Sequence, residues 1–310
     1  MKPLWAIELA QSLRGSMQPV FDPLTDSVYL SDGWGTSFAS LSLRRFSLED
    51  GAQTAALRLR APVFSVCFAS EKGSVLVATG KRLVEIDRRT WAEVARWESG
   101  VPKYSHYSAI VGRHVLLMGW AGPTLSIFDL VGGSCTRRRI GSCQGMFPRS
   151  DGSVLVCSGK QGVVSTCIPG ASSVQEFVKT ESFLGAVHCR AGDVLILAIG
   201  VPFEITETSA TSFRVSDRLK ILQLEEPAVE LDVRAPTAFD AFWVNADARR
   251  FFFGRGNLLR VYGFDGRELT LESERTLPNA LEPFLIVPER SIVLGADTKS
   301  DKGRIEAWRL

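Results

Sequence analysis

Apolar and polar residues alternate in short stretches along this chain, and one such stretch recurs seven times. Its copies are SVYLSDG (27–33), SVLVATG (74–80), HVLLMGW (114–120), SVLVCSG (153–159), DVLILAI (193–199), RFFFGRG (250–256) and SIVLGAD (291–297). The second residues serve as anchors: Val28, Val75, Val115, Val154, Val194, Phe251 and Ile292. Successive anchors are 47, 40, 39, 40, 57 and 41 residues apart. A period near 40 in strand-like segments is typical of β-propeller blades rather than helical repeats.

Each repeat is predicted to form four antiparallel strands. Repeat two shows the scheme most clearly, with strands expected at 63–69, 74–80, 82–87 and 92–98 separated by the turn signals EKG, GK and RRT. The alternation has period two, which indicates half-buried strands. Asp87, Asp129 and Asp265 follow an apolar residue at the end of a third strand, where Asp commonly starts a turn by accepting backbone hydrogen bonds.

The seventh repeat contains only three strands, at 283–288, 291–296 and 304–310. The N-terminal segment WAIEL (5–9) has no other place in the scheme. We therefore expect it to pair with the last strand and close the ring, since closure removes exposed sheet edges. The prediction is an all-β, seven-bladed β-propeller with four antiparallel strands per blade, formed by residues 1–310 as a single domain.

Composition agrees with a protein of this class. The chain has 36 basic and 34 acidic side chains, a balance that argues against wholesale nucleic-acid binding. No stretch is long and apolar enough to span a bilayer, and the N-terminus lacks the features of a secretory signal. None of the six cysteines shows a C-x-x-C spacing, so we expect buried free thiols and a cytoplasmic protein.

The blade count and the four-stranded scheme resemble the seven-bladed β-propellers of the broad WD-repeat and quinoprotein-like group over essentially the whole chain. No Gly-His dipeptide opens the blades and no Trp-Asp closes the third strands. The tryptophan-docking motifs of quinoproteins and the paired glycines of kelch repeats are also absent. The resemblance therefore implies a fold and transfers no functional residue.

In propellers of this type, the starts of the innermost strands surround a central channel. The residues ten positions before the anchors are mostly polar: Gln18, Ser65, Ser105, Gln144, Leu184, Ala241 and Glu282. Asp240 and Glu282 could hold Ca²⁺, with help from Asn245 or Gln18, in the manner that a resemblance to metal-dependent lactonases implies. A hydrated polar channel is the competing interpretation, and it predicts no metal and no cofactor.

Loops between the second and third strands, and those entering the innermost strands, carry large rings. The aromatic and histidine candidates for binding a partner are Trp34, Tyr104, His106, Tyr107, Trp120, Phe203 and Phe213. Aromatic side chains on irregular segments commonly anchor protein partners, although the tryptophans could instead cap the gaps between blades. The wide spacing in blade five predicts an insertion at 201–217, which is either a binding element or a neutral decoration.

Two functions follow as hypotheses. The first is a non-enzymatic interaction module, a scaffold or inhibitor of which an immunity-type protein is one version. Its loops carry Lys81, Arg82, Lys160, Arg255, Lys299 and Lys302, so we expect an acidic protein partner. The second is a metal-dependent, lactonase-like hydrolase with its site over the channel. None of the three histidines lies in a nucleophile–base–orienter pattern, and no catalytic residue is predicted.

Overall fold

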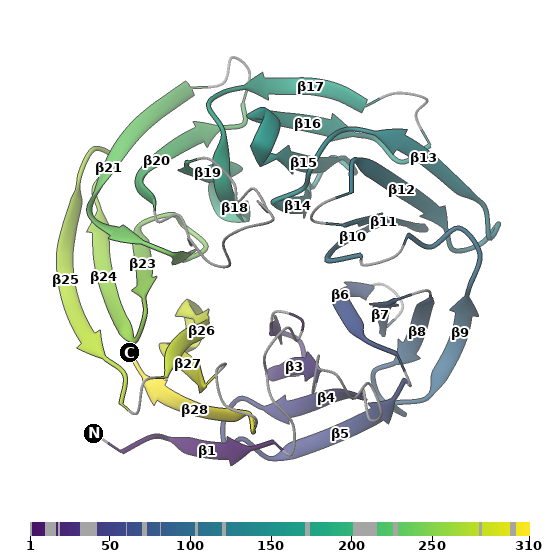
Figure 1. Cartoon of the computed structure of the whole chain (residues 1–310), viewed down its shortest axis with the longest axis horizontal. Helices are drawn as coiled ribbons and strands as arrows, with labels where there is room; N and C mark the ends of the chain where they lie inside the picture. Colours follow the sequence, from purple (N-terminus) through teal and green to yellow (C-terminus); the bar gives the residue numbers. More distant parts are fainter. Residues whose placement is uncertain are drawn as a thin grey trace, which may run out of the picture. The chain divides into compact units, whose positions relative to one another are not determined.

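The fold consists almost entirely of β-strands, as seen in a computed structural model of the chain (Figure 1). The structure describes residues 2–9, 17, 19–31, 42–59, 61–69, 73–80, 82–102, 105–119, 122–170, 174–200, 216–225, 229–278, 281–297 and 302–310. Within these residues the only helices are the short 3-10 turns Gly159–Gln161, Arg190–Gly192 and Pro288–Arg290. Over the same ranges, no helix is long and apolar enough to cross a membrane.

The strands form seven sheets of four, which we call blades one to seven in chain order. Blade one contains β2 (Val20–Asp22), β3 (Ser27–Ser31), β4 (Ser42–Ser47) and β5 (Gln53–Arg58). Blade two contains β6 (Val63–Ala69), β7 (Ser74–Thr79), β8 (Leu83–Asp87) and β9 (Glu93–Trp97). Blade three contains β10 (Tyr107–Val111), β11 (His114–Met118), β12 (Thr124–Asp129) and β13 (Cys135–Arg139).

The remaining blades follow the same order. Blade four contains β14 (Gly145–Pro148), β15 (Val154–Ser158), β16 (Val163–Cys167) and β17 (Val174–Lys179). Blade five contains β18 (Phe183–Cys189), β19 (Val194–Ile199), β20 (Ser216–Gln223) and β21 (Val229–Phe239). Blade six contains β22 (Ala241–Val244), β23 (Arg250–Arg255), β24 (Leu258–Phe264) and β25 (Leu269–Thr276). Blade seven contains β26 (Glu282–Val287), β27 (Ile292–Asp297), β28 (Arg304–Arg309) and β1 (Trp5–Glu8).

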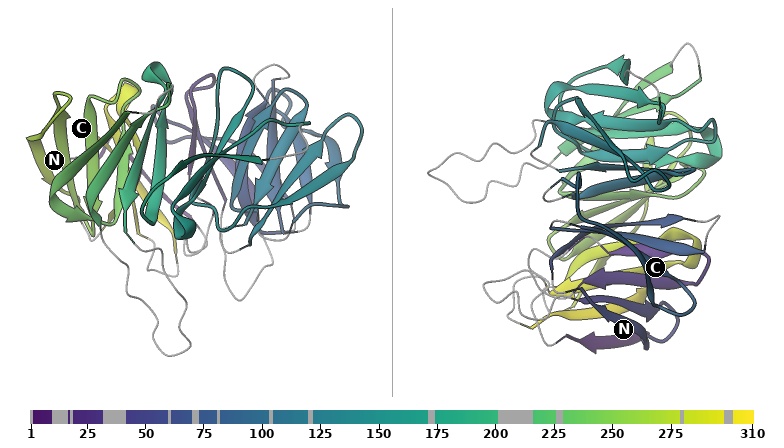
Figure 2. Two further views of the ribbon diagram at one scale, coloured as in Figure 1. Left: turned by 90° about the horizontal axis from the view of Figure 1, so that it is seen from above. Right: turned by 90° about the vertical axis from the view of Figure 1, so that its right-hand side faces the viewer.

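This arrangement confirms the predicted all-β fold of seven four-stranded antiparallel blades, whose strands twist along their length (Figure 2). It also confirms the place of the N-terminal segment. Strand β1 pairs with β28 in continuous register from Trp5 opposite Ala307 to Glu8 opposite Arg304. The indole Nε1 of Trp5 donates to the Leu48 carbonyl at 2.8 Å, so the first strand also ties blade seven to blade one.

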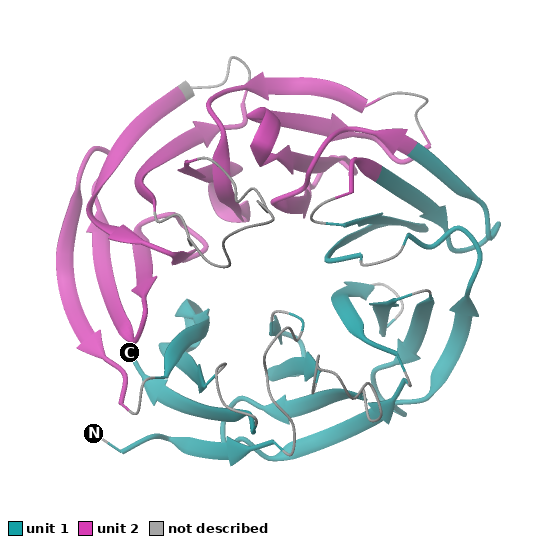
Figure 3. Cartoon of the chain, in the orientation of Figure 1, with its two compact units in different colours: residues 1–120, 125–137, 279–310 teal, residues 121–124, 138–278 magenta. Residues whose placement is uncertain are grey.

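By contacts the chain divides into two compact units (Figure 3). Unit 1 comprises residues 1–120, 125–137 and 279–310, and unit 2 comprises residues 121–124 and 138–278. Organisation of residues 1–310 as a single domain stays a prediction.

Within each unit the core lies between neighbouring blades, and it buries both faces of their second strands. Val75 and Val77 of β7 pack with Tyr29 of blade one, whereas Leu76 and Ala78 pack with residues of blade three. Every residue of β7 is buried. The burial explains why the recurring stretch is almost continuously apolar.

The predicted turn formers behave as expected. The carboxylate of Asp87 accepts from the backbone N–H groups of Arg89 and Thr90, and Asp265 accepts from those of Arg267 and Glu268. Asp129 accepts from the N–H of Val131. These bonds hold the pKa of each of the three carboxyls below its usual value. The six cysteines are free thiols, five of them buried.

Candidate functional site

Most of the predicted partner-binding rings cannot be placed. Trp34, Tyr104, Trp120, Phe203 and Phe213 lie outside the described residues. The same holds for residues 201–215 of the predicted insertion, and blade five resumes with β20 at Ser216. The role of these loops in binding a partner stays a prediction.

His106 and Tyr107 are described, and both are half-buried at the entry to blade three. The His106 ring meets Phe64 of blade two edge-on, with centroids 5.0 Å apart. Tyr107 is the first residue of β10 and lies opposite Met118 of β11. Each residue is therefore partly committed to packing, and its remaining exposed surface is what a partner could contact.

The polar residues predicted at the starts of the innermost strands bond to neighbouring backbone. Ser65 donates its hydroxyl to the Ser105 carbonyl at 2.6 Å, which links blades two and three. The side-chain oxygen of Gln144 accepts from the N–H of Gly159 at 2.5 Å. These side chains hold the strand entries in place, and Gln18 lies outside the described residues.

The two acids of the predicted metal site sit in different surroundings. Asp240 is exposed and accepts a long hydrogen bond from the N–H of Gly256 at 3.4 Å. Glu282 is half-buried and opens β26 opposite Ala296. Asn245 uses its side-chain oxygen to accept from the N–H groups of Arg249 and Arg250, which caps a turn. The described residues contain no group of three or more His, Cys, Asp or Glu side chains that could hold a metal.

The predicted basic loops are described only in part. Lys81 and Lys299 lie outside the described residues. Arg82 forms an ion pair with Glu98 at 3.1 Å, and the two side chains are 39% and 60% exposed. This cation is therefore partly neutralised within blade two.

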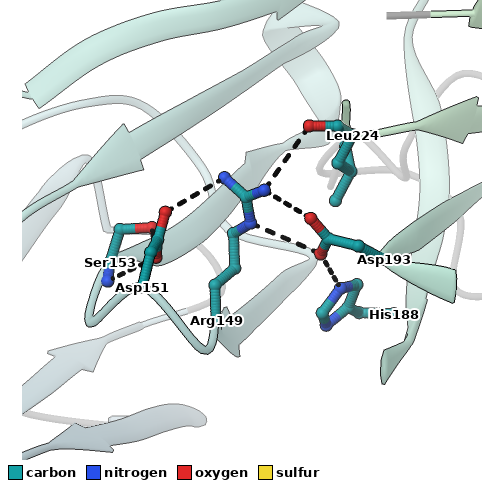
Figure 4. A network of polar contacts seen from close by, with 6 residues as sticks. All are labelled: Arg149, Asp151, Ser153, His188, Asp193 and Leu224. Atoms are coloured by element: carbon teal, nitrogen blue, oxygen red, sulfur yellow. Dashed lines mark hydrogen bonds and ion pairs between the residues drawn. The ribbon is translucent and has the colours of Figure 1, made fainter. Parts of the chain in front are cut away.

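A polar network between blades four and five was not predicted from the sequence (Figure 4). Arg149 follows β14, and its guanidinium bonds through Nε and Nη2 to the carboxylate of Asp193, which precedes β19. His188 of β18 contacts the same carboxylate, with Nε2 2.9 Å from Oδ1. Nη2 of Arg149 also donates to the Leu224 carbonyl at 3.4 Å, and Nη1 lies 3.5 Å from Asp151.

Electrostatics in this network favour ionised Asp193. Burial alone would raise the pKa of Asp193, but the hydrogen bonds from Arg149 and His188 outweigh burial and lower it. The imidazole of His188 is almost fully buried, whereas a third of the Asp193 side chain is exposed. All three guanidinium nitrogens of Arg149 already have partners. The arrangement acts as a clamp between blades four and five, and the Ser153 hydroxyl drawn beside it donates to Asp151.

A second unpredicted network joins blades one and two. Asp22, at the end of β2, lies 3.5 Å from Nη1 of Arg88, and the two side chains are 1% and 7% exposed. The guanidinium of Arg88 stacks over the ring of Phe68 at 4.7 Å. The hydroxyl groups of Thr25 and Tyr29 also reach the Asp22 carboxylate. Burial, reinforced by the negative charge of Asp22, raises the pKa of Tyr29 above its usual value.

Comparisons with known proteins support the fold. No family model and no curated protein sequence matches the chain. Among solved structures, a chain of the mitotic checkpoint complex matches with a TM-score of 0.73 and 11% identity, over 100% of this chain and 94% of that one. The Cps50 (Swd1) β-propeller domain of Myceliophteria thermophila matches with a TM-score of 0.69 and 9% identity, over 98% and 99% of the two chains.

Virginiamycin B lyase from Staphylococcus aureus matches with a TM-score of 0.68 and 12% identity, over 98% of both chains. These identities are low enough that the matches show the fold alone. Together with the strand order they define the class: the chain has a seven-bladed β-propeller fold, similar to that of the Cps50 (Swd1) β-propeller domain. Since the same fold occurs in an enzyme and in a protein complex, it does not by itself assign a function.

Proposed function

We propose that this protein is a non-enzymatic interaction module that binds another protein, as a scaffold or an inhibitor. The observation that carries the proposal is the match of the whole chain to a propeller from a protein complex, the mitotic checkpoint complex. Tightly packed blades add support, because a preorganised surface binds with little loss of conformational entropy. The partner would be held by the loops between second and third strands and by those entering the innermost strands.

Within the described residues, His106 and Tyr107 are the starting points for such a surface. Both belong to a strand entry and are partly exposed, and the backbone of Tyr107 pairs with Met118 within blade three. Rings held in this way lose little freedom on binding. The basic residues of the loops favour an acidic partner, and an immunity-type inhibitor is one specific version of the proposal.

Affinity capture tests the proposal. The intact chain is compared as bait with Trp34→Ala, with Tyr107→Ala and with a variant lacking residues 203–214. Leu24→Ser is a matched surface control, since Leu24 is 68% exposed in the turn between β2 and β3. We expect a stoichiometric protein with the intact chain and the control that is reduced or lost with the other three. A partner that all baits retain equally would contradict binding through the loops.

A metal-dependent, lactonase-like hydrolase is the second candidate, and the match to virginiamycin B lyase is the observation that favours enzymatic chemistry on this fold. That candidate requires a tightly held divalent ion. Elemental analysis of the purified protein, beside Asp240→Ala and Glu282→Ala, separates the two candidates. A stoichiometric metal that either substitution removes would support the hydrolase and count against the interaction module.

A further inference from the structure

The interface between blades one and two contains a buried guanidinium whose hydrogen bonds are incomplete. Arg88 is 6% exposed, and a buried charged side chain normally has partners for its polar atoms. Its Nη1 lies 3.5 Å from a carboxylate oxygen of Asp22, which is long for a charge-assisted hydrogen bond. Nε and Nη2 are buried and have no hydrogen-bond partner among the described residues. Arg88 therefore holds two unused donors inside the protein.

Both unused donors lie on the same edge of the Arg88 guanidinium. In this planar group the N–H of Nε and one N–H of Nη2 are parallel, so the edge can hold one anion through two hydrogen bonds. The interface between blades four and five shows the same edge in use, since Arg149 bonds through Nε and Nη2 to the carboxylate of Asp193. Arg88 presents this edge without a carboxylate among the described residues.

Asp22 does not serve the unpaired edge of Arg88. Its carboxylate contacts only Nη1 of the guanidinium. The same carboxylate accepts from the backbone N–H of Leu24 and from the hydroxyls of Thr25 and Tyr29, all in blade one. Asp22 is therefore well supplied with donors, whereas Arg88 still lacks acceptors.

A third unused donor belongs to the same cluster of side chains. The indole Nε1 of Trp91 is buried and has no hydrogen-bond partner in the part of the chain that the structure describes. The rings of Phe68 and Trp91 both pack against Tyr29, with centroids 5.2 and 5.5 Å from it. The guanidinium of Arg88 stacks over Phe68. The three unused donors thus lie around one cluster of aromatic rings: Tyr29, Phe68 and Trp91.

The charges around these rings do not cancel. The guanidinium of Arg45 lies over Trp91, 5.1 Å from its centroid, and Nη1 of Arg45 donates to the Arg88 carbonyl at 3.0 Å. Among the described residues, the charged side chains that stack on or hydrogen-bond to the three rings are one carboxylate and two guanidinium groups: Asp22, Arg45 and Arg88. An excess positive charge that is largely buried favours a bound anion, because an unpaired buried charge is costly.

The kind of group left unused favours an anion over water. Over the described parts of blades one and two, the buried side-chain nitrogens and oxygens without a hydrogen-bond partner are Nε and Nη2 of Arg88 and Nε1 of Trp91. All three atoms can only donate. A monatomic anion accepts from each of them, whereas a water molecule also brings two hydrogens that need acceptors. Burial of the donors further favours a small ion over a phosphate.

We propose that the interface between blades one and two binds a chloride ion at the Nε–Nη2 edge of Arg88. The ion neutralises the excess positive charge, and the indole N–H of Trp91 is a further donor to it. Since the ion binds the folded chain, it stabilises the fold in proportion to its occupancy. The site lies within unit 1 and needs no protein partner, so it and the proposed function can each fail alone.

The first test measures the melting temperature of the full chain while sodium chloride replaces sodium gluconate at constant sodium concentration. The control is the double variant Asp22→Leu with Arg88→Leu, which removes the site. Leucine suits the place of Arg88, since Leu48 and Leu130 make the equivalent backbone bond in blades one and three. Above the dissociation constant, the parent should gain about 2 °C more than the control for each tenfold rise in chloride. Equal responses of parent and control would show a general salt effect and overturn the proposal.

Single substitutions separate the parts of the site. Arg88→Lys keeps the charge but loses the paired N–H groups, so it should lose most of the chloride response. Arg96→Lys is the matched control in blade two, because the Arg96 side chain is 42% exposed and pairs with Glu93, and it should keep the response. Equal responses of the two lysine variants would contradict binding at the edge of Arg88.

Asp22→Asn reverses the expected direction. It keeps the shape of the side chain and removes a negative charge beside the ion, so chloride should bind about tenfold more tightly or better. Trp91→Phe keeps a ring and removes the indole N–H, so it should weaken chloride binding. Weaker or unchanged binding in Asp22→Asn would overturn the assignment.

Chloride NMR provides a measurement that does not depend on stability. The parent should broaden the chloride line more than the double variant does, and added bromide should reverse the excess. No excess broadening by the parent would contradict the proposal. Sodium formate distinguishes a carboxylate from a halide: stabilisation by formate at lower concentrations than by chloride would show that the edge selects carboxylates and would overturn the chloride site.

Discussion

Two interfaces between neighbouring blades, which we call seams, each contain an ion pair. The first residue of each pair lies at the same position of the repeat, but its charge is opposite in the two seams. Asp22 ends the innermost strand of blade one opposite Ser27, and Arg149 occupies the corresponding position of blade four opposite Ser153. Each reaches the next blade, where Asp22 meets Arg88 and Arg149 meets Asp193. One position of the repeat can therefore carry either sign, provided that the next blade supplies the opposite charge.

The two seams differ in their solvent exposure. The Asp22–Arg88 pair is buried beside the Phe68 ring, and Nε and Nη2 of Arg88 have no hydrogen-bond partner among the described residues. Asp193, in contrast, is partly exposed, and its carboxylate accepts from both Arg149 and His188. A buried pair with incomplete hydrogen bonding gains little over an apolar contact, whereas a partly hydrated one pays a smaller desolvation penalty.

Breaking the buried Asp22–Arg88 ion pair should cause the largest loss of stability. Asp22→Ala leaves the positive charge of Arg88 buried without its partner, and we expect a loss of about 3–5 kcal/mol in the free energy of unfolding. Urea denaturation followed by tryptophan fluorescence measures this. A loss below about 1 kcal/mol would mean that water already solvates Arg88 and that the seam is not dry.

A double substitution tests whether the buried pair is needed at all. Leu48, Leu130 and Leu224 occupy the position of Arg88 in other blades, since each donates its N–H to the turn after the innermost strand as Arg88 does. Leucine thus fits this position. Asp22→Leu combined with Arg88→Leu should restore stability to within about 1 kcal/mol of the parent or above it. A double variant as unstable as Asp22→Ala would contradict this interpretation.

Substitutions in the partly exposed Arg149–Asp193 seam should lower stability less, and the loss should depend on the backbone conformation of residue 193. Asp193 has a left-handed conformation, with φ of 46°, and Gly73 holds the corresponding turn of blade two with φ of 61°. Asp193→Ala loses the hydrogen bonds and keeps the strain, for an expected cost of about 2 kcal/mol. Asp193→Gly loses the same bonds but suits the conformation, so it should be about 1 kcal/mol more stable than Asp193→Ala. Equal stabilities of the two variants would show that the backbone strain is not significant.

The seams also show where sequence-based reasoning succeeded and where it did not. Strand β6 was predicted at its exact bounds, and β7, β8 and β9 to within one residue at each end, because alternation and turn residues act over short distances. Contacts such as Asp22 with Arg88 join residues 66 positions apart. A signal for the Asp22–Arg88 contact was nevertheless present in the chain. When the repeats are aligned by their third strands, Arg88 occupies the position that is leucine in three other blades. A charged residue at an otherwise apolar position indicates a polar partner in the adjacent blade.

His188 illustrates the opposite case. The sequence places none of the three histidines in a nucleophile–base–orienter pattern, and it gives no sign that His188 contacts Asp193 five residues later. Its contact with Asp193 depends on the left-handed turn at Asp193, and Arg149 reaches the same carboxylate from another blade. The candidate binding rings stay a prediction, since most of them lie outside the described residues and the period-two pattern of strands carries no information on loop side chains.

The smallest expected effect is the pH dependence of the contribution that Asp193 makes to stability. The pKa of Asp193 is lowered in the folded protein, so its contribution to stability is present above the unfolded-state pKa of about 3.9 and is lost as pH falls through the lower folded-state value. Asp193→Asn keeps the shape but cannot ionise. At neutral pH the free energy of unfolding of the parent should exceed that of Asp193→Asn by about 1 kcal/mol. The difference should shrink as the pH falls below about 4. Urea unfolding at both pH values measures the change, with the pair repeated in a His188→Gln background to remove the titration of the imidazole. A difference that stays constant with pH would mean that the Asp193 carboxylate is not the charged centre of the clamp.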